Sequence, residues 1–188
     1  MAKSAESIDK FKSKVSRGFA RPNLFEVSMD FPDALGIDAD IKNDCKFLVR
    51  AAQIPSFQLG VIEVPFRGRT LKIAGDRTFE PWTVTVMNDS EFKVRNAFER
   101  WVERIQDHEA NFQKGDGLDY FKDLKVKQLS RDSRDGDNAK VIRKYVFRNA
   151  FPTNISSIDL DYGNNDAIEE FTVELQVQYW APQSIESV

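Results

Sequence analysis

The sequence predicts a mainly β protein, an antiparallel β-barrel or β-sandwich with one α-helix packed against it. Three patterns carry this prediction. Residues 169–180 (EEFTVELQVQYW) alternate between apolar and polar side chains, as a half-buried strand does. Residues 89–107 carry a single apolar stripe at helical spacing. Asp135-Gly136, between two strand-like runs, is a strong hairpin signal.

Size and composition fit one domain, expected over 19–188, preceded by an arm. The chain has 188 residues, of which 41% are hydrophobic and 15 are Phe. The lone cysteine, Cys45, excludes an internal disulfide, and with the lone histidine, His108, it cannot form a zinc site of ordinary spacing. No run approaches the roughly 20 apolar residues that span a bilayer. The N-terminus also lacks the apolar stretch of a secretory signal, so we expect a soluble protein made in a cytoplasm, without membrane partners.

The arm, residues 1–18, is expected to adapt to a binding surface. Ile8, Phe11 and Val15 recur at helical spacing, which favours a short amphipathic helix. Gly18 would end that helix, because glycine readily takes the conformation that terminates helices.

Extended segments are expected next. Strand-like runs cover 23–31 and 46–52, and the stretch between them, 32–44, reads as a loop because it has many turn formers and no clear period. Residues 58–75 hold two extended runs around a Pro-Phe-Arg-Gly turn, whose glycine can take a positive φ. This segment therefore predicts a hairpin-like excursion.

Residues 80–88 (EPWTVTVMN) alternate cleanly, with Pro81 at the one end of a strand where proline is tolerated. The long helix over 89–107 follows, and Asn88 with Glu91 resembles a capping box at its start. The apolar stripe of this helix consists of Val94, Ala97, Phe98, Trp101, Val102 and Ile105.

After a loop over 108–119, four strands are expected: 120–129, 140–151, 155–162 and 169–180. Pro152-Thr153-Asn154 is expected to break the second of them from the third. In the last strand one face is apolar, formed by Phe171, Val173, Leu175, Val177 and Tyr179.

No motif supports catalysis, a metal or a cofactor. GDRTFEP (75–81) lacks the Gly-Lys pair of a phosphate loop, and 132–138 has the wrong glycine register for a calcium loop. Asp159 and Asp161 are paired carboxylates that could hydrolyse glycosides, yet a solvated polar strand face explains them more simply. The basic tip Arg67-Gly68-Arg69 favours a protein contact or simple solvation over nucleic-acid binding, because the chain as a whole is acidic.

Charge is unevenly spread along the chain. Residues 1–21 hold six Lys/Arg and two acids, about +4, whereas 152–188 hold seven acids and no Lys or Arg, −7. Opposite charges at the two ends favour head-to-tail attraction between copies. A solvated surface is the simpler alternative.

The segment AGDRTFEPWTVTVMND (74–89) resembles the signature segment of the tail tube proteins of contractile-tailed, T-even-like bacteriophages. FARPNLFEV (19–27), FPTNI (151–155) and EEFTVELQVQYW (169–180) resemble the same family in the same order, so the similarity spans roughly 18–181. It implies the fold of the haemolysin-coregulated tube protein of type VI secretion, a β-barrel flanked by a helix, and no catalysis.

The resemblance further implies a structural virion protein whose hexameric rings stack into the inner tube of a contractile tail. That tube would be the conduit for DNA ejection into the host, with DNA passing without specific binding. The implied partners are other copies of the chain, the tail sheath protein, the baseplate tube-initiator proteins and the tape measure protein in the lumen. The alternative is the tube of a type VI-like or extracellular contractile injection system, which delivers protein effectors.

Two sets of residues follow from this expectation. A bore lined by Lys and Arg would retain phosphates, whereas an acidic or neutral polar bore repels them. The expected lumen lining is therefore Glu174, Gln176 and Gln178, with Asp159 and Asp161 as weaker candidates. Contacts between rings are expected from the arm and from the hairpin excursion over 58–73, through Phe11, Phe19, Arg21, Phe66, Arg67 and Arg69.

Overall fold

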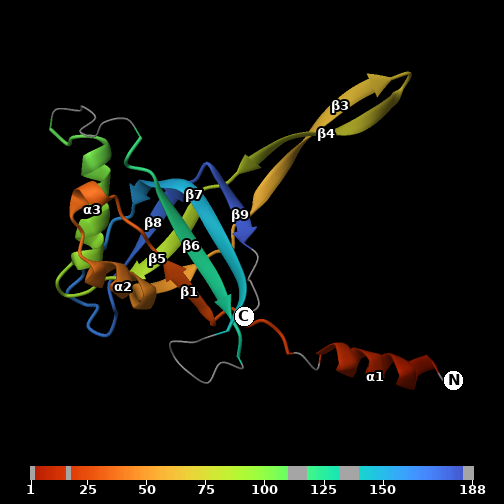
Figure 1. Ribbon diagram of the computed structural model, residues 1–188, viewed down its shortest axis with the longest axis horizontal. Helices are drawn as coiled ribbons and strands as arrows, with labels where there is room; N and C mark the ends of the chain where they lie inside the picture. The colour runs from red at the N-terminus through yellow and green to blue at the C-terminus, as the bar shows by residue number, and fades with distance from the viewer. Residues whose placement is uncertain (1–2, 16–17, 110–117, 132–139, 184–188) are drawn as a thin grey trace.

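A computed structural model describes residues 3–15, 18–109, 118–131 and 140–183, with only the backbone for residues 3–7 and 9. A β-sheet body carries two helices on one side, and a long hairpin and an N-terminal helix project from the other (Figure 1). The turn expected at Asp135-Gly136, and most of the loop expected over 108–119, lie outside the described residues.

Seven strands form one antiparallel sheet in the order β1-β6-β7-β8-β5-β2, and β9 pairs with β7. In the described residues no pairing joins β1 to β2, so the sheet does not close into a barrel within one chain. The bounds are β1 Phe25–Ser28, β2 Val49–Ala52, β5 Trp82–Met87, β6 Lys122–Leu129, β7 Val141–Ile155, β8 Glu170–Gln176 and β9 Tyr179–Gln183. The mainly β, antiparallel class predicted from the sequence is confirmed.

Strand β7 continues where a break was predicted. It runs through Pro152 to Ile155 and pairs with β6 in its first part and β8 in its last. The register with β8 shifts between Pro152 and Asn154, and such an irregularity tolerates a residue that lacks an N–H. The hydroxyl of Thr153 donates to the carbonyl of Glu174 at 3.2 Å, which holds the strand to its neighbour.

The strand predicted over 155–162 is wrong. The chain leaves the sheet after Ile155, and residues 156–169 form a loop. Turn chemistry prevails there over alternation, since the backbone N–H of Gly163 donates to Oδ1 of Asp161 at 2.9 Å. The last predicted strand is also split, because β8 ends at Gln176 and β9 begins at Tyr179. Tyr179, expected in the core, is consequently exposed.

The predicted long helix is confirmed but shorter: α3 spans Lys93–Ile105 rather than 89–107. Its buried side chains are Val94, Ala97, Phe98 and Trp101, four of the predicted stripe. The capping box predicted at its start is wrong. The amide of Asn88 donates instead to the carboxylate of Glu169 at 3.0 Å, and Phe92, at φ 55°, precedes the helix.

The loop predicted over 32–44 contains two helical segments, η1 (Asp33–Leu35) and α2 (Ala39–Leu48). Helix α2 also takes the first half of the strand predicted at 46–52, so β2 begins only at Val49. Ile41, Cys45 and Leu48 recur at helical spacing and pack against the core. Burial of that short stripe outweighs the turn formers around it. None of the helices in the described ranges is long and apolar enough to cross a membrane.

Aromatic side chains bind the layers of the body together. Trp82 of β5 stacks on Phe147 of β7 with ring centroids 4.0 Å apart, although β8 lies between these two strands in the sheet. Its indole N–H donates to the carbonyl of Gln53 at 2.8 Å, so the buried polar atom is satisfied. Helix α3 is attached by Trp101, which lies 5.7 Å from the ring of Phe31.

Two extensions leave this body (Figure 1). Helix α1 (Lys3–Val15) confirms the helix predicted in the arm, and Gly18, at φ 75°, donates its N–H to the carbonyl of Val15 at 2.8 Å. Strands β3 (Phe57–Phe66) and β4 (Arg69–Phe79) form a separate two-stranded sheet, which confirms the hairpin excursion.

Candidate assembly surfaces

The hairpin turn is built from the residues that its geometry requires. Arg67 and Gly68 both have positive φ, 45° and 80°, as in the type I′ turns that match the twist of paired strands. Phe66 and Arg69 are the last pair of the ladder. The guanidinium carbon of Arg67 lies 5.4 Å from the centroid of the Phe66 ring. The structure therefore gathers Phe66, Arg67 and Arg69 at one exposed tip.

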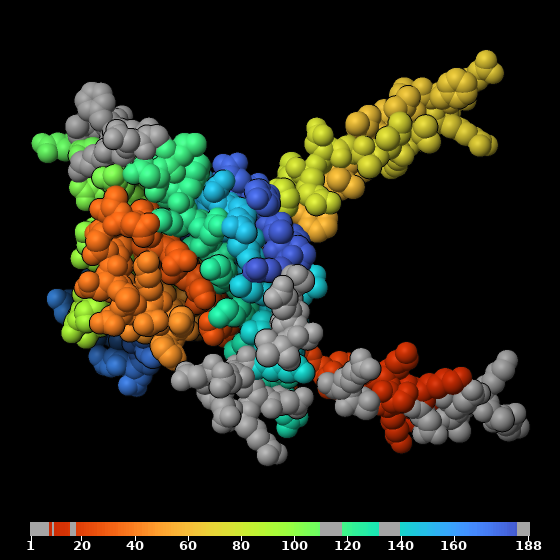
Figure 2. Space-filling view, in the orientation of Figure 1, coloured from red at the N-terminus to blue at the C-terminus, as the bar shows by residue number. Residues whose placement is uncertain are grey.

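One face of the hairpin is apolar and exposed. Ile62 pairs with Ile73 and Val64 pairs with Leu71, and directly opposite residues share a face. All four are exposed, and Phe66 at the tip is 67% exposed. The opposite face carries the ion pair between Glu63 and Lys72, at 3.3 Å. A lone two-stranded hairpin is marginally stable in water, and Figure 2 shows this hairpin projecting away from the body. Its exposed apolar face therefore indicates a contact surface.

The two strands of the hairpin approach closely at Gly60 and Gly75, where the register shifts and the ribbons cross (Figure 1). A Cβ atom on Gly75 would lie 3.1 Å from the carbonyl carbon of Gly60. A Cβ on Gly60 would lie 3.2 Å from the carbonyl oxygen of Asp76. Glycine is therefore needed on both strands for this crossing, which sets the direction of the outer half.

Trp180 of β9 anchors the root of the hairpin to the body. Its ring lies 5.5 Å from Phe57, 6.1 Å from Phe79 and 5.7 Å from Tyr145, measured between centroids. Its indole N–H donates to the carbonyl of Ser56 at 3.1 Å. Because Phe57 and Phe79 are the first pair of the hairpin ladder, this cluster fixes where the hairpin emerges.

The arm residues lie elsewhere. Phe11 on α1 and Phe19 after it are exposed, and Arg21 lies in the turn before β1. The carbonyl of Arg21 accepts the side-chain amide of Gln128 at 2.6 Å, which ties the base of the arm to β6. Helix α1 projects below the hairpin on the same side of the body (Figure 1). The structure thus places the residues expected at ring contacts on two separate projections.

Of the residues expected at the lumen, Glu174 and Gln176 lie together on the outer face of β8, between the buried Val173, Leu175 and Val177. Glu174 is opposite Thr83 of β5 and Asn154 of β7, so this face is polar across three strands. Gln178 lies beyond the end of β8, and its backbone N–H donates to the carbonyl of Arg148 at 3.2 Å. The structure does not place Asp159 and Asp161 on this strand face.

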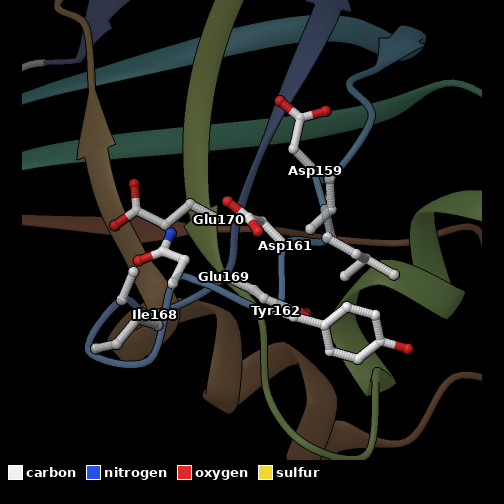
Figure 3. Close-up of a pocket in the computed structure, with 10 residues that line it drawn as sticks. Asp159, Asp161, Tyr162, Ile168, Glu169 and Glu170 are labelled. Carbon is white, nitrogen blue, oxygen red and sulfur yellow. The ribbon is translucent and has the colours of Figure 1, made fainter.

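Asp159 and Asp161 line a hollow of about 470 Å³ formed by the loop between β7 and β8 (Figure 3). Its apolar residues are large and open to solvent: Leu160 is 83% exposed, and Tyr162 and Ile168 are also exposed. The sequence reasoning missed this hollow. The cluster Asp-Tyr-Gly-Asn-Asn at 161–165 was the available signal for a loop here.

The outer face of strands β6 and β7 carries positive charge, whereas the outer face of β8 carries the negative charge of Glu174. Lys127 lies directly opposite Lys144, and Lys125 lies nearby on the same face. Partial burial, together with Lys125 and Lys127, lowers the pKa of Lys144 below its ordinary value. Lys127 is partly neutralised by Glu26 of β1, at 2.6 Å. The body therefore has one lysine-rich outer face and one face of Glu, Gln and Thr.

Cys45, the one cysteine of the chain, is buried. Burial raises the pKa of the Cys45 thiol to about 12, with Asp44 adding to the effect, so the thiol stays protonated at neutral pH. No cluster of His, Cys, Asp and Glu within the described ranges could hold a metal ion.

Known proteins with similar sequences and folds identify the family. A family model described as phage tail tube protein matches residues 20–183. The chain is 32% identical to tail tube protein gp19 of Enterobacteria phage T4 over 165 residues, 88% of this chain and 93% of that protein.

Two solved assemblies share the fold. A chain in the six-fold symmetrised baseplate of the anti-feeding prophage is similar with a TM-score of 0.61, 16% identity, and coverage of 90% of this chain and 98% of that one. A chain in the sheath–tube complex of the PVC extracellular contractile injection system has a TM-score of 0.56, 16% identity, and coverage of 92% and 97%. By the extent of the family match and the identity to the phage protein, this chain belongs to the phage tail tube protein family.

Proposed function

We propose that copies of this chain close into hexameric rings, and that the rings stack to form the inner tube of a contractile phage tail, the conduit for DNA ejection into the host. The observation that carries the proposal is the β3–β4 hairpin, which exposes an apolar face in a chain related to tail tube proteins. Such a face would be covered by a neighbouring copy in a tube.

Closure of a ring is supported by the strand edges. In the described residues β1 pairs only with β6, β2 only with β5 and β9 only with β7. Each leaves one row of backbone donors and acceptors without a strand partner, and unpaired edges promote association. In our proposal unlike edges of adjacent copies meet, because a heterologous contact repeated by rotation closes into a ring. We place Phe11, Phe19 and Arg21 of the arm, and the hairpin tip, at contacts between rings.

The charges of the two outer faces suggest which face lines the bore. DNA would adhere to the face formed by Lys125, Lys127 and Lys144, because phosphates bind lysines by releasing counterions. The β8 face carries Glu174, which repels phosphates, and the neutral Gln176, which does not attract them. We therefore propose that the β8 face lines the lumen, with Gln178 at its margin. For Asp159 and Asp161 we infer a different role below, because they lie on a loop.

The proposal includes partners. In a contractile tail the tube is enclosed by the sheath protein, starts on baseplate tube-initiator proteins, and holds the tape measure protein in its lumen. The protein would be made in the host cytoplasm and end in the virion. The alternative is a tube of a contractile injection system that carries protein effectors. The PVC sheath–tube complex, which shares the fold, comes from an extracellular contractile injection system. Similarity at 16% identity shows the fold alone, and the 32% identity to a phage protein favours the phage tail.

Negative-stain microscopy of the purified chain, alone and with baseplates, tests the proposal. We expect hollow rods built of six-fold rings. A variant with Val64→Thr, Phe66→Thr and Leu71→Thr should remain folded but form at least tenfold fewer rods. The matched control, Glu63→Gln with Lys72→Gln on the opposite face of the hairpin, should polymerise normally. Globular particles alone from the unmodified chain, even with baseplates present, would refute the proposed tube.

A further inference from the structure

We infer that the hairpin tip of one copy docks into the hollow between β7 and β8 of a second copy in the adjacent ring. The hairpin tip is defined by Phe66, Arg67, Arg69 and Leu71, and the hollow by the loop over 158–170. This inference rests on the proposed stacking of rings, and it names the surface that receives the hairpin.

The hollow has the surface of an unoccupied contact. Leu160, Tyr162 and Ile168 are large, apolar and exposed, and they lie within one short loop. Figure 3 shows Tyr162 and Ile168 on opposite sides of the lining, with the carboxylate of Asp161 between them in this view and Asp159 farther away. In the described residues no other element of the chain covers these side chains. An apolar cluster of this kind is typical of a site that a partner covers.

The charges of the tip and the hollow are complementary. Arg67 and Arg69 make no ion pair within the part of the chain that the structure describes, although Arg67 contacts the Phe66 ring. In the hollow, Glu169 accepts the Asn88 amide and Glu170 pairs with Arg50. Oδ1 of Asp161 accepts the backbone N–H of Gly163, but neither Asp159 nor Asp161 makes an ion pair within the described residues. Both carboxylates can therefore receive guanidinium groups, which form strong charge-assisted hydrogen bonds with carboxylates.

The apolar parts of the two surfaces match as well. Phe66 and Leu71 lie on the same face of the hairpin as Val64 and Ile73, so a docked tip would bring apolar side chains against Leu160, Tyr162 and Ile168. A contact with an apolar centre and a charged rim is the usual anatomy of a specific interface. Both components are present at the tip and in the hollow.

The placement of the two surfaces suits stacking between copies. The hairpin projects from one side of the body, and the loop that forms the hollow lies on the other side (Figures 1 and 2). A strand rises about 3.3 Å per residue, so the ten residues of β3 carry the tip roughly 30 Å outward. Tip and hollow at opposite sides make a head-to-tail contact, which repeats without limit along one axis.

Helix α1 is the competing occupant, because it is also basic and exposes Phe11. The hairpin is favoured as the occupant of the hollow because its tip is preorganised. The type I′ turn fixes Arg67 and Gly68, the glycine crossing sets the direction, and Trp180 holds the root. A preorganised element loses less conformational freedom on binding than an arm joined through a glycine.

Cross-linking in the full-length chain tests the contact. Thr70→Cys beside the tip, combined with Asn164→Cys in the lining of the hollow, leaves the proposed charge pairs intact; this variant is assembled and treated with a short bismaleimide. We expect a ladder of covalent oligomers, because each copy carries both a tip and a hollow. The matched control, Thr78→Cys with Asn164→Cys, places the first thiol near the hairpin root and should give at least tenfold less product. Cys45 is buried and unreactive in both variants. An equal yield from both pairs would overturn the inference.

Charge reversal gives a second test. Arg67→Glu with Arg69→Glu, and separately Asp159→Lys with Asp161→Lys, should each reduce rods at least tenfold. All four changes in one chain should restore rods, because the pairing is re-formed with reversed sign. If the variant with all four changes forms no rods, this docking is overturned. It is also overturned if Lys12→Cys, and not Thr70→Cys, cross-links to Asn164→Cys. These outcomes would leave the proposed tube standing if the variant with Val64→Thr, Phe66→Thr and Leu71→Thr loses rods. The proposed tube itself fails only if the unmodified chain forms no rods.

Discussion

Trp180→Ala should detach the hairpin from the body and prevent polymerisation while leaving a folded domain. The substitution removes three ring contacts and the hydrogen bond to Ser56. Each aromatic pair stabilises by about 0.5–1.5 kcal/mol, and a hydrogen bond contributes about 1 kcal/mol. Trp180 is only half-buried and the contacts are not additive, so we expect a loss of roughly 3 kcal/mol.

That loss is measurable by thermal unfolding. For a domain of this size 1 kcal/mol corresponds to about 2–4 °C, so Tm should fall by roughly 6–12 °C. Hydrogen exchange should show the largest acceleration in β3 and β4, and negative-stain images should show few rods. Trp180→Phe is the matched control, since it keeps most ring contacts and should cost only about 1 kcal/mol. If Trp180→Ala unfolded like the unmodified chain, with hairpin amides still protected, the cluster would not be the anchor of the hairpin.

Three further predictions concern the crossing, the thiol and the bore. Gly75→Val places a Cβ against the Gly60 backbone and should destabilise the hairpin by about 1–3 kcal/mol. Hydrogen exchange should become faster in the hairpin only, and unchanged exchange would contradict the close crossing. The pKa of Cys45 is raised from 9.0 to about 12 in the folded state, so between these two pH values the folded state holds a proton that the unfolded state has lost. The free energy of unfolding should therefore fall as the pH rises through this range, by up to about 1.4 kcal/mol per pH unit. Denaturant titrations of the unmodified chain and of Cys45→Ala should differ in this slope, and equal slopes would contradict the buried thiol. Glu174→Lys should leave tubes intact but slow DNA ejection, whereas failed polymerisation would place this residue at an interface.

The elements with a strong local period were predictable from the sequence. Strand β5, strand β8 and the body of α3 each bury one face against a single core, so burial imposes a period of two or of 3.6 residues on the sequence. The hairpin was predictable for another reason, because a Pro-Phe-Arg-Gly turn between extended runs is local turn chemistry. Membership of a family of structural tail tube proteins also confirms that the chain is not an enzyme.

The errors arose where distant partners decide local structure. Pro152 remains in β7 because β8 accommodates an irregular register, which no local rule around Pro152 reveals. Helix α2 forms because Ile41, Cys45 and Leu48 meet the core, although their neighbours favour turns. The candidate site divides in the same way. The tip residues Phe66, Arg67 and Arg69 are adjacent in sequence, whereas the hollow depends on the path of the chain between β7 and β8.

The charges of the hairpin bear on how a chain with an exposed apolar face stays soluble before assembly. Residues 57–79 contain four Lys or Arg and two acids, so hairpins of free copies repel one another. Cations beside an apolar strand pair hinder edge-to-edge aggregation. The same cations assist docking if the receiving surface is acidic, as the hollow is at Asp159 and Asp161. One set of charges thus opposes contact between two hairpins and favours contact between a hairpin and a hollow, so that growth along the tube axis is selected over side-by-side association.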